Sequence, residues 1–285
     1  MAITAAQVNE LRQKTGAGMM DCKKALTEAD GNMEKAIELL RKKGAAVAAK
    51  RAEKSANEGL VLTKVTDNGK TGVIIEVNCE TDFVAKSPDF INFANIVLDT
   101  IAEKKPSNVD DVLKNYPAVQ EKLSDIMGKV GEKIEISRFA IDNNENGIDI
   151  DYVHLGSKLG VLIKFDNITN PNEELLTIGK DIAMQVAAMK PICVYREEVP
   201  KDIIEKEIDI YKELARKEGK PEQILQKIAE GKLNKYYQEN CLFEQAFIKD
   251  NSKSVGELIK EYNTKNGTQV KIGLFHRFHL SDENK

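Results

Sequence analysis

The sequence predicts an α+β protein in which antiparallel sheets are backed by helices. Three observations lead to this prediction. Residues 60–66 and 72–78 are expected to pair as strands, the second with Val73, Ile75 and Val77 on one face, on either side of Asn68-Gly69, a pair typical of tight hairpins. A strand pattern followed by a helix pattern occurs at 72–103 and again at 159–189, which indicates two related subdomains.

The third observation is that residues 1–43 show only helical periodicity, so we expect a three-helix domain there. Thr4 can cap its first helix and Asn32 its third. Gly44 follows three basic residues, a pattern that predicts the end of the third helix. The Ala- and Lys-rich segment 44–58 is then expected to be a semi-rigid linker.

Residues 59–141 are expected to form the first core subdomain. After the hairpin, Ser87 is a typical N-cap and Pro88 a typical first helical residue. A further helical stretch at 119–127 precedes a strand at 133–141.

Residues 142–285 are expected to form the second core subdomain. Strands at 148–154 and 159–165 precede a helix that Asn170 and Pro171 open. The closing elements are a helix with a capping box, Ser254 and Glu257, and an alternating strand at 270–280.

A charged segment at about 199–235 interrupts this second subdomain. Its narrow apolar stripe is interrupted by the turn sequence Gly219-Lys220-Pro221 and then resumes. This pattern predicts an inserted helical coiled-coil hairpin that protrudes from the core.

Composition restricts the class of protein. The chain has 285 residues and a net charge of −4, so no overall positive field attracts nucleic acid. Its four cysteines are widely spaced, as in proteins of a reducing compartment. The N-terminus lacks the pattern of a signal peptide, and no apolar run reaches the roughly 20 residues that cross a membrane. We expect a cytoplasmic protein that does not bind membranes.

No catalytic arrangement stands out. Gly69-Lys70-Thr71 lacks the upstream glycine and the following helix of a phosphate-binding loop. His276 and His279 point to opposite faces of a strand, and Cys79 alternates with the core residues. The residues therefore predict a non-catalytic binding protein without cofactor or metal.

One segment does suggest a functional site. The strand-to-helix connection from Glu80 to Lys86 places Asp82 and the large aromatic Phe83 in a polar segment. Such connections often carry function. The aromatic side chain either packs into the core or contacts a partner.

Four stretches closely resemble the bacterial translation elongation factor Ts family. They read LRQKTGAGMMDCKKA from Leu11, NCETDFVAK from Asn78, YVHLGSKLGVLI from Tyr152 and DIAMQVAAMKP from Asp181. The resemblance spans nearly the whole chain. It implies a ubiquitin-associated-like (UBA-like) N-terminal domain, a core of two subdomains, and guanine-nucleotide exchange on elongation factor Tu.

The resemblance also implies the contact residues. Thr81, Asp82, Phe83 and Val84 correspond to the family's intruding segment, with Phe83 as a wedge beside the magnesium and phosphate site of the partner. Such a segment weakens nucleotide binding without covalent chemistry.

Two further contact regions are implied. In the N-terminal domain, Met19 and Met20, with Leu11 nearby, would contact the partner's G domain, unless Met20 belongs to the core. In the second subdomain, the candidates are His154, Leu155 and Gly156. There the sequence departs from the family pattern at Leu155, Ser157 and Lys158, which leaves that contact open.

Two other classes of function remain alternatives at this point. The basic stretch 41–54 could bind nucleic acid, with an affinity that falls steeply with salt, although a solvated tether is the simpler interpretation. Cys79 or His154 could serve an enzyme. The sequence also leaves a monomer, a homodimer and a 2:2 complex with the partner open.

Overall fold

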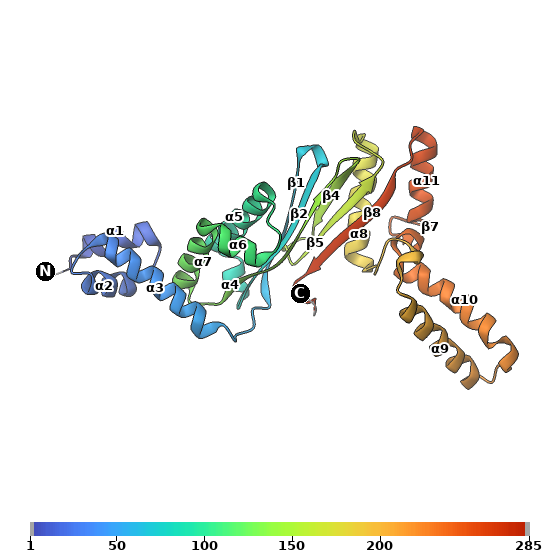
Figure 1. Ribbon diagram of the computed structural model, residues 1–285, viewed down its shortest axis with the longest axis horizontal. Helices are drawn as coiled ribbons and strands as arrows, with labels where there is room; N and C mark the ends of the chain where they lie inside the picture. Colours follow the sequence, from blue (N-terminus) through green and yellow to red (C-terminus); the bar gives the residue numbers. More distant parts are fainter. Residues whose placement is uncertain (1–2, 283–285) are drawn as a thin grey trace.

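The structure is a computed structural model that describes residues 3–282. Its core has four layers, which are helices, a three-stranded sheet, a second three-stranded sheet and further helices (Figure 1). A helical module lies at one end of the core, and a two-helix hairpin projects at the other (Figure 1). The α+β class predicted from the sequence is therefore confirmed.

The N-terminal module consists of α1 (Ala5–Thr15), α2 (Met19–Glu28) and α3 (Met33–Arg51). Thr4 and Asn32 cap α1 and α3 as predicted, since their side-chain oxygens accept hydrogen bonds from backbone amides of the first turn. The module has a small core of its own, formed by Val8, Leu11, Ala17, Cys22, Ala25, Leu26, Ala29 and Ala36.

The prediction that the third helix ends at Gly44 is wrong, because α3 continues to Arg51. Gly44 lies where α3 crosses α7 (Pro117–Val130), opposite Gly128. A Cβ atom on Gly44 would lie 2.1 Å from the carbonyl oxygen of Ser124. The glycine therefore permits a close helix crossing, and this packing outweighs its helix-propensity cost of about 1 kcal/mol.

The first sheet contains β1 (Glu58–Thr66), β2 (Thr71–Cys79) and β3 (Ile134–Asn143), all antiparallel in the order β1-β2-β3. The predicted hairpin is confirmed, with Asn68 in the left-handed conformation at φ 54°.

Three helices accompany this sheet, namely α5 (Pro88–Lys104), α6 (Val109–Asn115) and α7. The cap by Ser87 and the first-turn proline of α5 are as predicted. α6 was not expected, because its seven residues are too few for a clear periodicity.

The second sheet contains β4 (Gly147–Val153), β5 (Leu159–Asp166) and β8 (Lys271–His279) in the order β4-β5-β8. Its outer face packs on α8 (Glu173–Met189) and α11 (Val255–Asn266). The start of α8 was predicted two residues too early, since Asn172 is the N-cap. The capping box that opens α11 is as predicted.

The two sheets pack face to face. All nine residues of β2 are buried, because Val73, Ile75 and Val77 face the helices while Ile74 faces the second sheet. The contact between the sheets is formed by Val61, Ile74, Leu162, Phe278 and Leu280. The sheets approach so closely that a Cβ atom on Gly160 would lie 2.7 Å from Val61 Cγ1.

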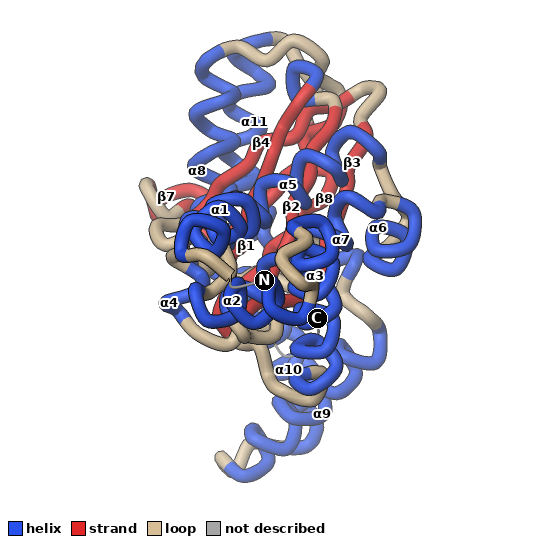
Figure 2. Tube along the Cα trace, turned by 90° about the vertical axis from the view of Figure 1, so that its left-hand side faces the viewer, coloured by secondary structure: helices blue, strands red, loops and turns tan. Residues whose placement is uncertain are grey.

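The predicted two-helix hairpin is present as α9 (Lys201–Lys217) and α10 (Glu222–Asn240). Figure 2 shows it pointing away from the sheets. The short strands β6 (Ala246–Phe247) and β7 (Asp250–Ser254) follow it. The hairpin therefore starts from a compact base beside α8 and α11 rather than from the sheets themselves.

Candidate functional site

The connection between β2 and α5 forms a single helical turn, α4 (Asp82–Ala85), capped by Thr81. The Thr81 hydroxyl oxygen accepts a hydrogen bond from the amide of Val84 at 3.4 Å. It also donates to the carboxylate of Glu132 at 2.7 Å, and the Thr81 amide donates to the same carboxylate at 3.1 Å. The turn is thus fixed at its first residue by a side chain 51 positions further along the chain.

Phe83 points away from the core. Its side chain is 83% exposed, whereas Val84 packs against the first core cluster and Ala85 is buried. A single helical turn has only one buried side, so anchoring Val84 and Ala85 leaves Phe83 facing solvent. Of the two interpretations left open by the sequence, packing of Phe83 into the core is excluded. An exposed aromatic side chain on a rigid support is suited to bind a partner.

Asp82 forms an ion pair with Lys86 at 2.8 Å, one turn later in the chain. The hydrogen bond from Lys86 lowers the pKa of Asp82, with a smaller contribution from the charge of Lys158. Asp82 is therefore ionised at neutral pH and can make polar contacts beside the exposed ring of Phe83.

The base of α4 is also held by an ion pair and a backbone hydrogen bond. Glu80 accepts hydrogen bonds from the Arg51 guanidinium at 2.6 and 2.8 Å and from the Lys133 amide at 2.6 Å. Burial opposes ionisation of Glu80, but these hydrogen bonds prevail and lower its pKa. The C-terminal end of α3 is thereby joined to the end of β2, directly below the exposed turn.

Cys79 is fully buried beneath α4, as its alternation predicted, and its thiol lies 3.2 Å from the Thr81 carbonyl oxygen. Burial and the nearby Glu132 carboxylate raise the pKa of Cys79 to about 12. A protonated, inaccessible thiol is not a nucleophile, so the enzyme interpretation based on Cys79 has no support.

A second exposed turn, residues 154–158, connects β4 to β5. Leu155 is 96% exposed, and His154 and Gly156 are exposed beside it. The turn is fastened to the first subdomain, since the Ser157 carbonyl oxygen accepts from the Val61 amide at 2.6 Å and Lys158 pairs with Glu58 at 2.7 Å. Lys158 is also close enough to act on Asp82, so this turn and α4 share one side of the molecule.

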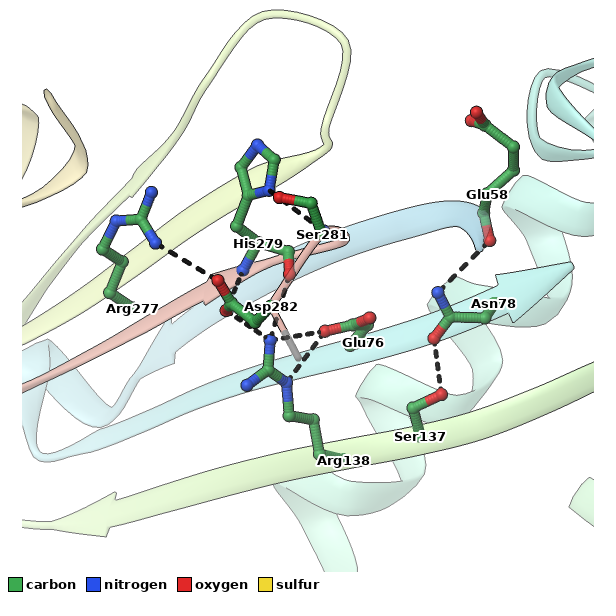
Figure 3. A network of polar contacts seen from close by, with 9 residues as sticks. All are labelled: Glu58, Glu76, Asn78, Ser137, Arg138, Arg277, His279, Ser281 and Asp282. Carbon is green, nitrogen blue, oxygen red and sulfur yellow. Dashed lines mark hydrogen bonds and ion pairs between the residues drawn. The ribbon is translucent and has the colours of Figure 1, made fainter. Parts of the chain in front are cut away.

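A polar network ties the end of the chain to the first sheet behind α4 (Figure 3). The Arg138 guanidinium contacts the buried Glu76 carboxylate at 2.8 Å and Asp282 at 2.7 Å, and it lies 4.1 Å from the centre of the Phe278 ring. Asn78 donates to the Glu58 carbonyl oxygen and accepts from Ser137. The two subdomains are therefore joined rigidly close to α4.

The N-terminal module contributes a third exposed surface. Met19 and Met20, the first two residues of α2, are 52% and 63% exposed, so Met20 is not a core residue. Leu11 is fully buried within the module. The expectation that Leu11 lies at the contact surface is therefore wrong. Its apolar character reflects the small core that supports α2.

Between residues 3 and 282, no group of three or more His, Cys, Asp or Glu side chains is arranged to hold a metal ion. In the same range, no helix has both the length and the apolar character of a membrane span.

Sequence comparisons show what this chain is similar to. A family model described as "Elongation factor TS" matches residues 80–282. Relatives named "Elongation factor Ts" include those of Chlorobaculum parvum, 47% identical over 98% of both chains, and Chloroherpeton thalassium, 43% identical over 99% of both chains. The relative of Clostridium botulinum is 42% identical over 97% of this chain and 92% of its own.

Proposed function

The chain belongs to the elongation factor Ts family, and from this membership we propose that it is a guanine-nucleotide exchange factor for elongation factor Tu. It would act in the cytoplasm during translation elongation, by binding rather than by covalent catalysis. The observation that carries the proposal is the exposed Phe83 on its capped and ion-paired helical turn.

The proposed step is insertion of the Thr81–Val84 turn into the G domain beside the bound Mg²⁺ and phosphates. Nucleotide affinity of such domains depends on the metal and on backbone amides around the phosphates. A ring that displaces these groups weakens nucleotide binding. By linkage, the nucleotide weakens binding of the factor to the same extent.

Rigidity of the turn supports this step. A flexible loop would lose conformational freedom on insertion, which reduces the binding energy available to displace the nucleotide. Here Thr81, Glu132 and Glu80 hold the turn before any partner is present. Asp82, ionised beside the ring, would make polar contacts in the site that the metal leaves.

The two other exposed surfaces would bind the same partner. Met19 and Met20 suit an apolar contact with the G domain, because methionine side chains adapt to irregular surfaces. The turn of His154, Leu155 and Gly156 would make a separate contact on the side of the molecule that carries α4.

The test replaces Phe83 by alanine and follows release of a fluorescent GDP analogue from elongation factor Tu. Burying a phenylalanine side chain contributes roughly 2–3 kcal/mol, so Phe83→Ala should slow catalysed release by about 30- to 160-fold. Circular dichroism should be unchanged, since the ring is solvent-exposed. Leu176→Ala, another exposed apolar residue but on α8, is the matched control and should exchange normally. Normal release with Phe83→Ala would refute the wedge.

A further inference from the structure

Two cysteines lie side by side at the base of the helical hairpin. Cys193 is in the segment between α8 and α9, and Cys241 caps the C-terminal end of α10. Their sulfur atoms are 3.6 Å apart, although the residues are 48 positions apart in the sequence. The pair therefore brackets the hairpin at the point where its two helices leave the core.

Backbone hydrogen bonds fix the two cysteines in this position. The Ile192 amide donates to the Asn240 carbonyl oxygen at 2.9 Å, and the Leu242 amide donates to the Cys193 carbonyl oxygen at 3.0 Å. Cys193 and Cys241 form an isolated parallel β-bridge. Bridged neighbours are spaced by roughly 4.8 Å, which falls within the Cα separation of about 4.4–6.8 Å that a disulfide requires.

The other two cysteines provide the contrast. Cys22 and Cys79 are each fully buried in a different core cluster, where they act as small apolar side chains. Cys193, in contrast, is only partly buried. Cys193 is thus the more exposed residue of the pair, and its sulfur lies 3.6 Å from that of the buried Cys241.

We propose that Cys193 and Cys241 form a reversible oxidation site that closes to a disulfide with a low-molecular-weight disulfide as oxidant. The Cys193 thiolate attacks one sulfur of the oxidant, forms a mixed disulfide and releases one thiolate. The Cys241 thiolate then attacks the Cys193 sulfur, so the internal S–S bond forms and the second thiolate leaves. The two thiol protons end on the two released thiols. The protein is oxidised by two electrons and the oxidant is reduced by two.

Burial raises the pKa of both thiols, that of Cys241 to about 12. At neutral pH the thiolate fraction is small, so the pair closes slowly and responds to sustained oxidation. The rate should rise with pH, because both steps need a thiolate.

Closure would clamp the base of the hairpin. The covalent bond would join the strand-like segment before α9 to the end of α10, and a cross-link across a long segment restricts its opening. Under oxidising conditions the base of the hairpin would then be covalently linked, whereas under reducing conditions only non-covalent contacts would hold it. This property is independent of the proposed nucleotide exchange.

The experiment oxidises the reduced full-length chain with oxidised glutathione, unfolds it in urea, blocks the remaining thiols there with iodoacetamide, and maps disulfides by mass spectrometry after digestion. The expected result is a cross-linked peptide pair that contains Cys193 and Cys241, with titratable thiols falling from four to two. Dithiothreitol should restore all four. Cys193→Ser and Cys241→Ser should each abolish the internal disulfide, whereas Cys22→Ala should retain it.

Other outcomes would overturn the proposal. They are four reactive thiols after treatment, a stable glutathione adduct on Cys193 alone, or a disulfide that includes Cys22 or Cys79. The clamp itself is tested by amide hydrogen exchange in α10. Oxidation should slow exchange near Leu233 and Tyr237, which pack at the base, in the wild type but not in Cys193→Ser. Equal exchange in the oxidised and reduced wild type would rule out the clamp.

Discussion

Replacing Asp149 by asparagine should stabilise this protein at neutral and alkaline pH but not at acidic pH. Asp149 lies on β4 and is only 3% exposed, between the two sheets. Asn144 donates a hydrogen bond to it at 2.6 Å. Burial, and secondly the negative charge of Asp142, raise the pKa of Asp149 to about 7, against the hydrogen bond from Asn144 and the smaller effects of Lys164 and His276.

Proton linkage gives the direction in which the ionisation of Asp149 changes folding stability with pH. The unfolded chain releases the Asp149 proton near its ordinary pKa of 3.8, whereas the folded chain keeps it up to about pH 7. Stability therefore falls as pH rises between these values and stays reduced above the upper one. A difference of roughly 3 pH units corresponds to at most about 4 kcal/mol, since each unit is worth about 1.36 kcal/mol. We expect about 1–3 kcal/mol after relaxation of the site.

The assay is urea unfolding of wild type and Asp149→Asn at about pH 4 and about pH 8. The amide keeps an oxygen that can accept the Asn144 hydrogen bond, so the packing should be preserved. The variant should gain stability relative to wild type only at the higher pH. Asp110→Asn, at an exposed site on α6, should show no such difference. Equal changes in stability at both pH values, or a loss at about pH 8, would refute the reasoning.

Two further predictions concern the contacts that hold the parts together. Arg138→Met removes the guanidinium that neutralises the buried Glu76 carboxylate, which should cost about 3–5 kcal/mol in urea unfolding. Adding Glu76→Gln should recover part of the loss. Gly44→Ala places a Cβ atom 2.1 Å from the Ser124 carbonyl oxygen, so α3 should separate from α7 and small-angle scattering should show a longer particle. Gly231→Ala, with open space around it, is the matched helical control.

Clear outcomes would contradict these two predictions. If the double variant of Arg138 and Glu76 is no more stable than Arg138→Met, the cost does not arise from the buried charge. If Gly44→Ala scatters like the wild type, the helix crossing accommodates a methyl group and does not set the position of the N-terminal module.

Local patterns predicted much of the secondary structure. The Asn68-Gly69 hairpin, the cap at Ser87 and the capping box at Ser254 depend on residues within a few positions of one another, so they can be read directly. The two errors in helix bounds have different causes. The stop expected at Gly44 and the early start of α8 were overridden by packing or by a competing cap nearby.

For the site, the sequence identified the unusual segment but not its geometry. It singled out Phe83 as an aromatic residue in a polar connection and left its direction open. The residues that hold the turn were not identified. Glu132 is 51 positions from Thr81, and Arg51 is 29 positions from Glu80. A periodic pattern in the sequence cannot identify these partners, because only the fold brings side chains that are far apart in the sequence into contact.

The sequence alone determined the α+β class, the two strand-and-helix units and the family resemblance, because periodicity, turn residues and motifs are local properties. Tertiary structure decided which apolar residues face solvent. Leu11 is buried, whereas Met20 and Phe83 are exposed, although all three are large and apolar. The physical reason is that burial depends on which surfaces the rest of the chain covers, and the face-to-face sheets and the α3–α7 crossing settle that question.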